Sequence, residues 1–263
     1  MPENAAGPTR REEQRAKTYV EILNTARELL VADGSAAITL RAIAREMRMA
    51  PTALYRYYPS LNDLLISLVE SFYAEITDKL RKACDAVPEG PLQAGYRVIV
   101  ACREFRDWAI NHQNEFILVF GRPIPSLSDL KHAEDAGEEF ESGRQFGGFF
   151  LGVFLAVWAS KPFPVPAEDQ MEPGLAAQLR DYAAGINIDI PVGTVHEFLY
   201  CWTRLFGILT MEVTGHLNFA LSNVEPMFEE MLAECAERLN LPAQVLGRTS
   251  LIPGDGDRNG DVQ

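Results

Sequence analysis

Apolar residues recur along most of the chain at three-and-four spacing, the period of an amphipathic α-helix. Alternation of apolar and polar residues, which would predict a half-buried strand, does not persist over any convincing length. Helices are therefore expected at residues 12–32, 40–47, 51–58, 60–83, 92–111, 115–120, 192–219 and 224–239, together with an apolar run at 145–160. The pattern predicts an all-α protein.

The segment 39–65 has the residue types of two short helices that are joined by a turn and followed by a third helix. Thr39 is a preferred N-cap for the first helix, and a three-residue break follows that helix. Pro51 has a φ angle suited to the first position of the second helix. Ser60 and Asp63 have the spacing of a capping box at the start of the third helix.

A helix, a turn of about three residues and a second helix form the helix-turn-helix motif, whose second helix enters the major groove of DNA. In this second helix Leu54 is expected to face inward, whereas Thr52, Tyr55 and Arg56 face outward. Arg56 can pair with guanine or bind a phosphate, the hydroxyls of Tyr55 and Tyr57 suit phosphates, and Thr52 suits base edges. The segment is therefore predicted to read DNA.

The same residues resemble the TetR family of bacterial transcriptional regulators. The likeness rests on a Thr-x-Arg-x-Ile-Ala opening and a Thr-x-Leu-Tyr-Arg-x-x-Pro-Ser core, formed here by Thr39, Arg41, Ile43, Ala44, Thr52, Leu54, Tyr55, Arg56, Pro59 and Ser60. The resemblance implies a DNA-binding surface made of Thr39, Arg41, Pro51, Thr52, Ala53, Tyr55, Arg56, Tyr57 and Ser60.

Three positions depart from the family pattern. Ala53 stands where threonine or an equivalent residue is usual. Arg48 occupies a turn position at which the family usually has glycine, which predicts a positive φ or a reshaped turn. Leu61 stands where a phosphate-binding lysine is common, so one backbone contact is expected to be lost.

The charge of the chain is unevenly distributed. The formal net charge is −13, which argues against a protein that coats nucleic acid with a broad basic surface. Residues 1–60 nevertheless carry nine Arg or Lys against seven Asp or Glu, a net charge of +2 that leaves −15 for the remainder. A small DNA-reading head on a large acidic body is expected to have this asymmetry, because only the head can approach phosphate.

The helix predicted at 192–219 carries a second resemblance, to the effector domain of one branch of TetR regulators. Trp-x-x-Leu-His-Gly and Glu-x-x-Gly-His elements are matched by Trp202, Leu205, Phe206, Gly207, Glu212, Gly215 and His216, with phenylalanine in place of the usual first histidine. Two apolar stripes on this helix require burial on both sides. With the helix at 224–239, which Ser222 is expected to cap, it is predicted to form a four-helix dimer interface. A core helix of a monomer is the alternative.

Large aromatic residues concentrate in two stretches of the body. Most are expected to be plain core, but Gly147, Gly148 and Gly152 weaken a helix that only needs to pack, and they leave space beside the rings. The resemblance places an effector pocket in this domain. The candidate ligand-binding residues are Phe105, Trp108, Phe116, Phe120, Phe149, Phe154, Trp158 and Trp202, and the candidate polar anchors are Arg103, His112, Arg122 and Tyr200.

The 263 residues divide into a disordered arm at 1–11, a helix-turn-helix head at 12–59, a helical body at 60–243 and a disordered tail at 244–263. The N-terminus has no apolar signal segment, and the uncharged run at 145–160 is shorter than the roughly 20 residues of a membrane span. The four widely spaced cysteines are expected to be reduced, buried hydrophobes rather than disulfides or metal ligands. A cytoplasmic protein without membrane, metal or cofactor partners is expected.

Enzymatic motifs are not found: the sequence has no nucleophile elbow, phosphate loop, dinucleotide fingerprint or His-Glu-x-x-His. The leading hypothesis is a homodimeric repressor that binds operator DNA and releases it when a small apolar or aromatic effector binds. A module of the same fold that binds DNA or a partner without an effector is the first alternative. A helical enzyme is the second.

Overall fold

The computed structural model describes residues 9–121 and 141–247. Within those ranges the chain forms helices and contains no strand, which confirms the all-α prediction. The helices are α1 (Arg10–Asp33), α2 (Leu40–Glu46), α3 (Pro51–Leu54), α4 (Leu61–Asp85), α5 (Gln93–Asn111), α6 (Gln113–Phe120), α8 (Glu141–Ser160), α9 (Pro173–Gly185), α10 (Val192–Val213) and α11 (Glu225–Arg238), with short 3-10 turns at Ser35–Ala37, Glu168–Gln170 and Ala243–Leu246.

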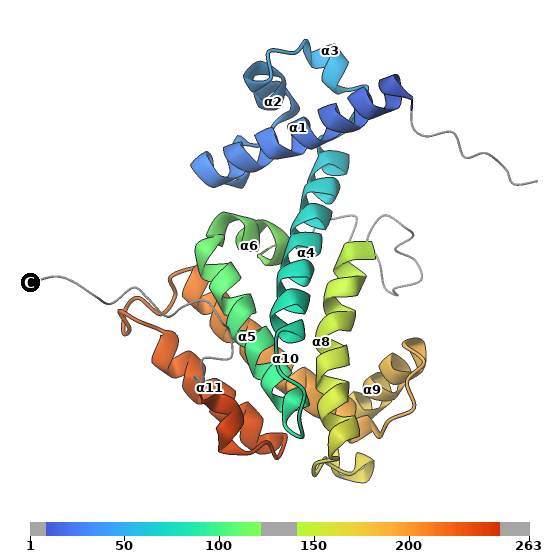
Figure 1. The fold of residues 1–263 in the computed structure, drawn as a ribbon, viewed down its shortest axis with the longest axis vertical. Coiled ribbons are helices and arrows are strands. Elements are labelled where there is room, and N and C mark those ends of the chain that lie inside the picture. The colour runs from blue at the N-terminus through green and yellow to red at the C-terminus, as the bar shows by residue number, and fades with distance from the viewer. Residues whose placement is uncertain (1–8, 122–140, 248–263) are drawn as a thin grey trace, which may run out of the picture.

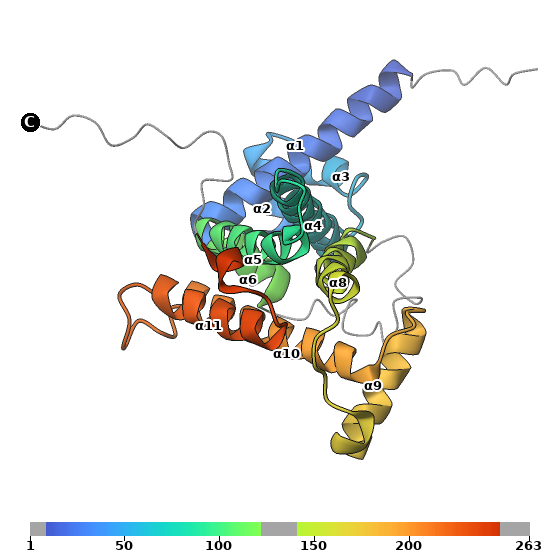
Figure 2. The same cartoon turned by 60° about the horizontal axis from the view of Figure 1, so that its bottom comes forward.

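Two parts of the fold are visible in Figure 1. A head of α1, α2 and α3 lies at one end, and α4 runs from it into a body made of the remaining helices. Inside the body α4 packs against α5 and α8 (Figure 2). The apolar stripe of α4 that the sequence predicted is buried, including Leu64, Leu68, Phe72, Ile76 and Leu80. One hydrophobic core therefore runs continuously from the head into the body.

The N-caps predicted from the sequence are formed at the starts of two helices. The Thr39 hydroxyl accepts a hydrogen bond from the Ala42 amide at 3.0 Å, which caps α2. At α4 the Ser60 hydroxyl accepts from the Asp63 amide at 3.2 Å, while the Asp63 carboxylate accepts from the Ser60 amide at 3.0 Å. These reciprocal bonds fix where α4 begins, and so fix the joint between head and body.

Several boundaries differ from the predicted ones. The first helix begins at Arg10 because Thr9 and Glu12 form a capping box, so Arg10 and Arg11 belong to α1 and not to the arm. Ser222 does not cap α11; the Asn223 side chain accepts from the first amide of that helix instead. The predicted tail at 244–263 was wrong at its start, since Val245 is buried in the core. The tail beyond residue 247, the arm before residue 9 and Arg122 lie outside the described residues.

The helix predicted at 192–219 ends earlier, at Val213. Gly215 adopts a φ of +72°, and the amides of Gly215 and His216 donate to the carbonyls of Glu212 and Met211. This is the Schellman arrangement, in which a left-handed residue closes the last turn. Gly215 therefore ends the helix rather than allowing another helix to approach. A helix that was not predicted, α9, fills part of the segment between α8 and α10.

Candidate DNA-binding surface and ligand groove

The second helix of the helix-turn-helix, α3, ends at Leu54 and not at the predicted residue 58, and Tyr55 to Tyr57 form the turn that follows it. Leu54 is fully buried beneath it, whereas Thr52 and Arg56 are exposed and Tyr55 is 49% exposed. Pro51 opens the helix at its first position, with no side-chain cap before it. Thr52, Tyr55 and Arg56 are thus free to meet a DNA groove.

The turn before α3 depends on a strained residue. Arg48 adopts a φ of +53°, as its replacement of glycine predicted. Its amide donates to the Arg45 carbonyl at 3.1 Å, and the Met49 amide donates to the Ala44 carbonyl at 2.8 Å, so the turn has the Schellman pattern. A left-handed conformation costs an ordinary residue roughly 1–2 kcal/mol. The turn therefore keeps its usual shape and stores strain in Arg48.

Tyr57 supports the recognition helix rather than standing free beside it. Its ring is half-buried and meets the ring of Tyr19 edge-on at 5.1 Å. The Tyr19 hydroxyl donates to the Tyr57 carbonyl at 3.3 Å and accepts from Arg15 at the same distance. These contacts tie the turn after α3 to α1. Sequence reasoning did not single out Arg15 or Tyr19, although both lie on one face of the first helix.

A hollow of about 660 Å³ lies between the start of α1 and α3. Arg11, Arg15 and Arg56 border it together with Ala53 and Tyr57. Three guanidinium groups around one concave surface suit the phosphates of a nucleic acid backbone. The structure therefore adds the first turns of α1 to the candidate DNA surface.

The remaining predicted DNA-binding residues have different positions. Arg41 is exposed on α2, next to the turn. The hydroxyls of Thr39 and Ser60 are engaged in helix caps, so their observed role is to fix α2 and α4. Such caps can still lie close to DNA, because helix N-termini attract phosphate.

The predicted ligand-binding residues separate into two groups. Phe105, Trp108 and Phe116 are fully buried, and Phe105 contacts the rings of five aromatic neighbours. These three residues, with Phe120, Phe149 and Trp158, line neither of the two apolar cavities described below. Their packing shows a core, which corrects the expectation that they form a ligand wall. Phe154 and Trp202 do border cavities.

A groove of about 660 Å³ lies among α8, α9 and α10. Its lining is largely apolar and consists of Arg144, Gly147, Gly148, Phe150, Leu151, Gly152, Leu155, Tyr182, Ile186, Ile188, Phe198, Leu199 and Trp202. A methyl group built at any of the three glycines would meet no atom within 4 Å. The space predicted beside these glycines therefore exists, and its volume lies within the roughly 300–1,000 Å³ of small-molecule sites.

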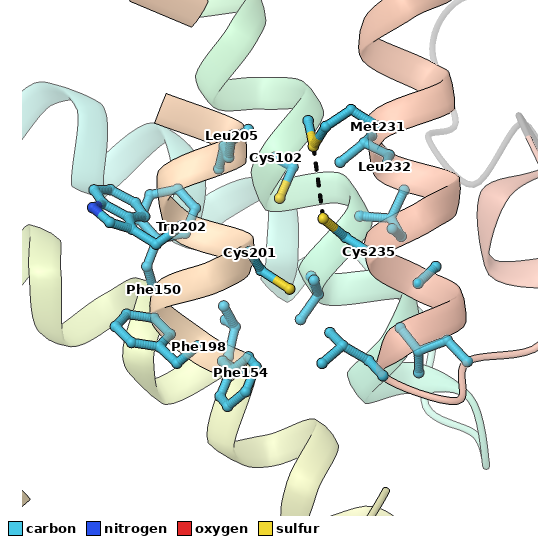
Figure 3. Close-up of a pocket in the computed structure, with 16 residues that line it drawn as sticks. Cys102, Phe150, Phe154, Phe198, Cys201, Trp202, Leu205, Met231, Leu232 and Cys235 are labelled. Carbon is cyan, nitrogen blue, oxygen red and sulfur yellow. Dashed lines mark hydrogen bonds between the residues drawn. The ribbon is translucent and has the colours of Figure 1, made fainter. Parts of the chain in front are cut away.

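A second cavity, of about 50 Å³, lies among α5, α8, α10 and α11 (Figure 3). Phe154 and Trp202 border it, along with three cysteine side chains. Trp202 thus lies between the groove and this cavity, and its ring stacks on Phe105 in the core at an interplanar angle of 3°. A group that displaces Trp202 must therefore also disturb the aromatic core.

The proposed polar anchors have other partners. Arg103 binds the Glu229 carboxylate at 2.7 Å and the Leu246 carbonyl at 2.8 Å. His112 stacks on Trp108, and Tyr200 lies under the guanidinium of Arg238. Arg103, His112 and Tyr200 line neither the groove nor the smaller cavity.

The last two helices bury the residues through which dimerisation was expected. Leu209 and Phe228 belong to the apolar stripes of the two helices predicted to form the interface, but both are fully buried in the core of their own chain and so cannot contribute to it. Met211 on α10 is 44% exposed, and Met227 on α11 is 47% exposed. Both border one hollow of about 300 Å³. Exposed apolar side chains of α10 and α11 therefore lie on the outer face of this helix pair.

An ionic contact joins head and body. Arg27 of α1 binds Glu75 of α4, and Glu75 also accepts a hydrogen bond from the Trp108 indole at 3.1 Å. Burial raises the pKa of Glu75, but the hydrogen bonds from Arg27 and Trp108 outweigh burial and lower it overall. Glu75 is therefore held as a carboxylate at neutral pH, bonded to both the head and the aromatic core.

The four cysteines are free, and Cys84, Cys102 and Cys235 are buried as predicted, whereas Cys201 is half-buried. Within the described ranges, His, Cys, Asp and Glu side chains form no group that could hold a metal ion. No helix of residues 9–121 or 141–247 is long and apolar enough to cross a membrane.

Comparisons with known proteins agree with this geometry. The model of bacterial regulatory proteins of the tetR family matches residues 22–68, and the model of the tetracyclin repressor-like C-terminal domain matches residues 98–235. The HTH-type transcriptional regulators Mb1846 of Mycobacterium bovis and Rv1816 of Mycobacterium tuberculosis are each 30% identical over 148 residues, which are 56% of this chain. The match covers only 61% of the length of each relative.

Two solved structures share the fold. The protein SCO4313 superposes with a TM-score of 0.65 at 24% identity, over 87% of this chain and all of that one. A protein of unknown function from Rhodococcus sp. RHA1 gives 0.57 at 18% identity, over 90% and 97% of the two chains. The model of the C-terminal domain matches more than half of this chain, and the helix-turn-helix at its N-terminal end has an exposed second helix at residues 51–54. The chain belongs to the TetR family of bacterial regulatory proteins.

Proposed function

We propose that the protein is a cytoplasmic, homodimeric transcriptional repressor that binds a pseudo-palindromic operator and releases it when a small apolar ligand binds. The observation that carries the proposal is the exposed surface of α3 and the turn after it, where Thr52, Tyr55 and Arg56 are exposed and Arg56 borders the same hollow as Arg15 of α1. Arginine and hydroxyl groups on a recognition helix are suited to base edges and phosphates. One head buries too little surface for tight specific binding, which favours a dimer.

The groove among α8, α9 and α10 is the proposed ligand site. Its volume of about 660 Å³ and its aromatic and aliphatic lining favour an apolar, aromatic ligand of drug-like size. The smaller cavity of about 50 Å³ cannot hold such a molecule. A ligand in this groove would contact Trp202, Phe150 and Phe198, which are part of its lining.

Coupling between ligand and DNA is proposed to run through Trp202 and the aromatic core. Trp202 stacks on Phe105 of α5, and Trp108 on the same helix donates to Glu75, which binds Arg27 of the head. A ligand that shifts this chain of contacts would change the angle between α4 and α1. The separation of two heads in a dimer would then change, while the spacing of DNA half-sites is fixed.

A thermodynamic cycle tests the proposal. Duplexes selected by the protein from a random library are expected to contain two inverted half-sites with centres about 34–36 Å apart. An aromatic compound found by quenching of tryptophan fluorescence, with Trp202→Phe as control, should lower duplex affinity about 5- to 150-fold. The duplex must lower the affinity for that compound by the same factor. A compound bound in the groove that leaves duplex affinity unchanged would overturn the ligand response.

A further inference from the structure

Three of the four cysteines border the small cavity between α5, α10 and α11. Cys102 comes from α5, Cys201 from α10 and Cys235 from α11, and their sulfur atoms lie around one space in Figure 3. The rest of the lining is apolar. The oxidisable groups in this lining are the three thiols and the Met231 thioether, and the proposed effector does not require them.

Cross-helix contacts set the register between α10 and α11. Glu197 near the start of α10 receives two hydrogen bonds from Arg238 near the end of α11, at 2.7 and 2.8 Å. Farther along α10, Arg204 forms an ion pair with Glu234 of α11. The two helices are therefore antiparallel. Cys201 lies one turn after Glu197. The residue of α11 that faces Cys201 must therefore lie between residues 234 and 238.

Cys235 occupies that facing position. Both helices present these two cysteines toward the cavity, with an ion pair on either side of them. Because an ion pair on each side fixes the register of α10 and α11, the two thiols stay opposite each other. Cys84, by contrast, lies on α4, is 4% exposed and does not border the cavity.

The two facing thiols differ in acidity. The neighbouring Cys201 thiol, opposed by burial and helped by Arg204 and Arg238, lowers the pKa of Cys235, whose thiol donates a hydrogen bond to the Met231 sulfur at 3.7 Å (Figure 3). The neighbouring Cys235 thiol and burial raise the pKa of Cys201. Burial raises the pKa of Cys102 and raises that of Cys84 to about 11. The positive charges of Arg204 and Arg238 favour the thiolate of Cys235, and the thiolate is the form that attacks an oxidant.

We propose that Cys235 and Cys201 form a redox site at which a small peroxide produces a disulfide between α11 and α10. The Cys235 sulfur attacks one peroxide oxygen, the O–O bond breaks, and the departing hydroxide takes up the proton released by Cys235 to give water. The Cys201 sulfur then attacks the sulfenic acid on Cys235, the S–O bond breaks, and a second water leaves with the proton of Cys201. Two thiols lose two electrons, and hydrogen peroxide is reduced to two waters.

The size of the cavity decides which oxidants fit. About 50 Å³ accommodates water-sized molecules and hydrogen peroxide, whereas bulky aromatic hydroperoxides belong to the volume class of the larger groove. The redox site is therefore separate from the proposed effector site, and its chemistry requires neither DNA nor ligand.

Thiol counting and peptide mapping test the inference on the full chain. Protein reduced with dithiothreitol and desalted is treated with hydrogen peroxide, and thiols are counted after unfolding in denaturant. Two of the four thiols should be lost, a single cross-link between Cys201 and Cys235 should appear in non-reducing peptide maps, and dithiothreitol should reverse both changes. Survival of all four thiols, or a cross-link to Cys102 or Cys84, would overturn the proposal.

Variants separate the roles of the two cysteines. Cys84→Ser should behave as the parent does, losing two thiols. Cys201→Ser should accumulate a sulfenic acid on Cys235 that dimedone labels, and Cys235→Ser should keep its three thiols at the same peroxide concentration. Dimedone labelling of Cys201 in the last variant, at the rate seen for Cys235, would contradict the assignment of Cys235 as the attacking thiol. The peptide map of the parent protein decides the cross-link even if a variant fails to fold.

Discussion

Arg27 in the DNA-binding head lies 3.3 Å from the carboxylate of Glu115 in the body, whose side chain is only 4% exposed. The same guanidinium binds Glu75 of α4 at 2.5 Å. The Asn114 side chain, next to Glu115, donates to the Val31 carbonyl of α1 at 3.2 Å. Three helices of the head and body therefore meet at Arg27, and α1 cannot tilt against α4 and α6 without breaking these bonds.

Replacing Arg27 should show how much this joint between head and body contributes to stability. Arg27→Met leaves the buried Glu115 carboxylate without its cation, and the free energy of unfolding should fall by about 2–3 kcal/mol, less than for a fully buried pair because Arg27 is 32% exposed. Adding Glu115→Met should recover most of the loss. Urea unfolding measures both values. If the double variant is no more stable than Arg27→Met alone, the unpaired Glu115 carboxylate is not the cause of the lost stability.

The strained turn gives a prediction of opposite sign. Arg48→Gly should raise the free energy of unfolding by about 0.5–1 kcal/mol, because relief of the left-handed strain exceeds the entropy that glycine loses on folding. Arg45→Gly, three residues earlier in α2, removes the same charge at a helical position and should lower stability by about 1 kcal/mol. Thermal unfolding compares the two. Equal losses in both variants would mean that the φ of +53° carries no strain.

Gly147, Gly148 and Gly152 face open space, so a larger side chain at one of them can fill the proposed ligand groove without disturbing the core. Gly148→Leu should block ligand binding, because its side chain would project into the groove of about 660 Å³. The variant should also be about 0.5–1 kcal/mol more stable, since leucine favours a helix over glycine. Gly148→Ala should gain similar stability and still bind ligand. Calorimetric titration distinguishes the two variants, and undiminished binding by Gly148→Leu would move the ligand site elsewhere.

The dimer is expected to form through the exposed methionines of α10 and α11. Met211→Glu with Met227→Glu places charges on this outer face and should give a folded monomer in sedimentation velocity, with an unchanged far-ultraviolet spectrum. Val20→Glu, at a position of α1 that is 57% exposed, is the matched control and should remain a dimer. Dimers that persist in the double variant would exclude this face. Phe228→Glu is unsuitable as a test, because a charge in the core would unfold the chain.

The head could be predicted closely from sequence because its signals are local. Caps at Thr39 and Ser60, the proline at the start of α3 and the turn at Arg48 each depend on neighbours within a few residues. The start of α1 was placed too late because the capping box at Thr9 was not recognised. A polar arm and a polar first helical turn have similar compositions.

The body was harder to predict because tertiary contacts decide which side of an aromatic helix faces a cavity. Phe105 and Phe154 look alike in sequence, yet one is surrounded by rings and the other borders a cavity. Helix α9 was overlooked because its buried stripe is small, formed by Ala176, Leu179 and Ala183, and follows a proline-rich connector. The glycines of α8 were the better guide, since a missing side chain leaves space whichever rings surround it.

The central claim, that α3 reads DNA, is tested most directly by the affinity of Arg56→Ala for the selected duplex. Fluorescence anisotropy at fixed salt should show a loss of about 1–3 kcal/mol, or roughly 5- to 150-fold, with an unchanged melting temperature. Arg180→Ala removes one positive charge from α9 in the body and should bind as the parent does. Equal affinity of Arg56→Ala and the parent, or equal losses in both variants, would contradict the assignment of α3 as the recognition helix.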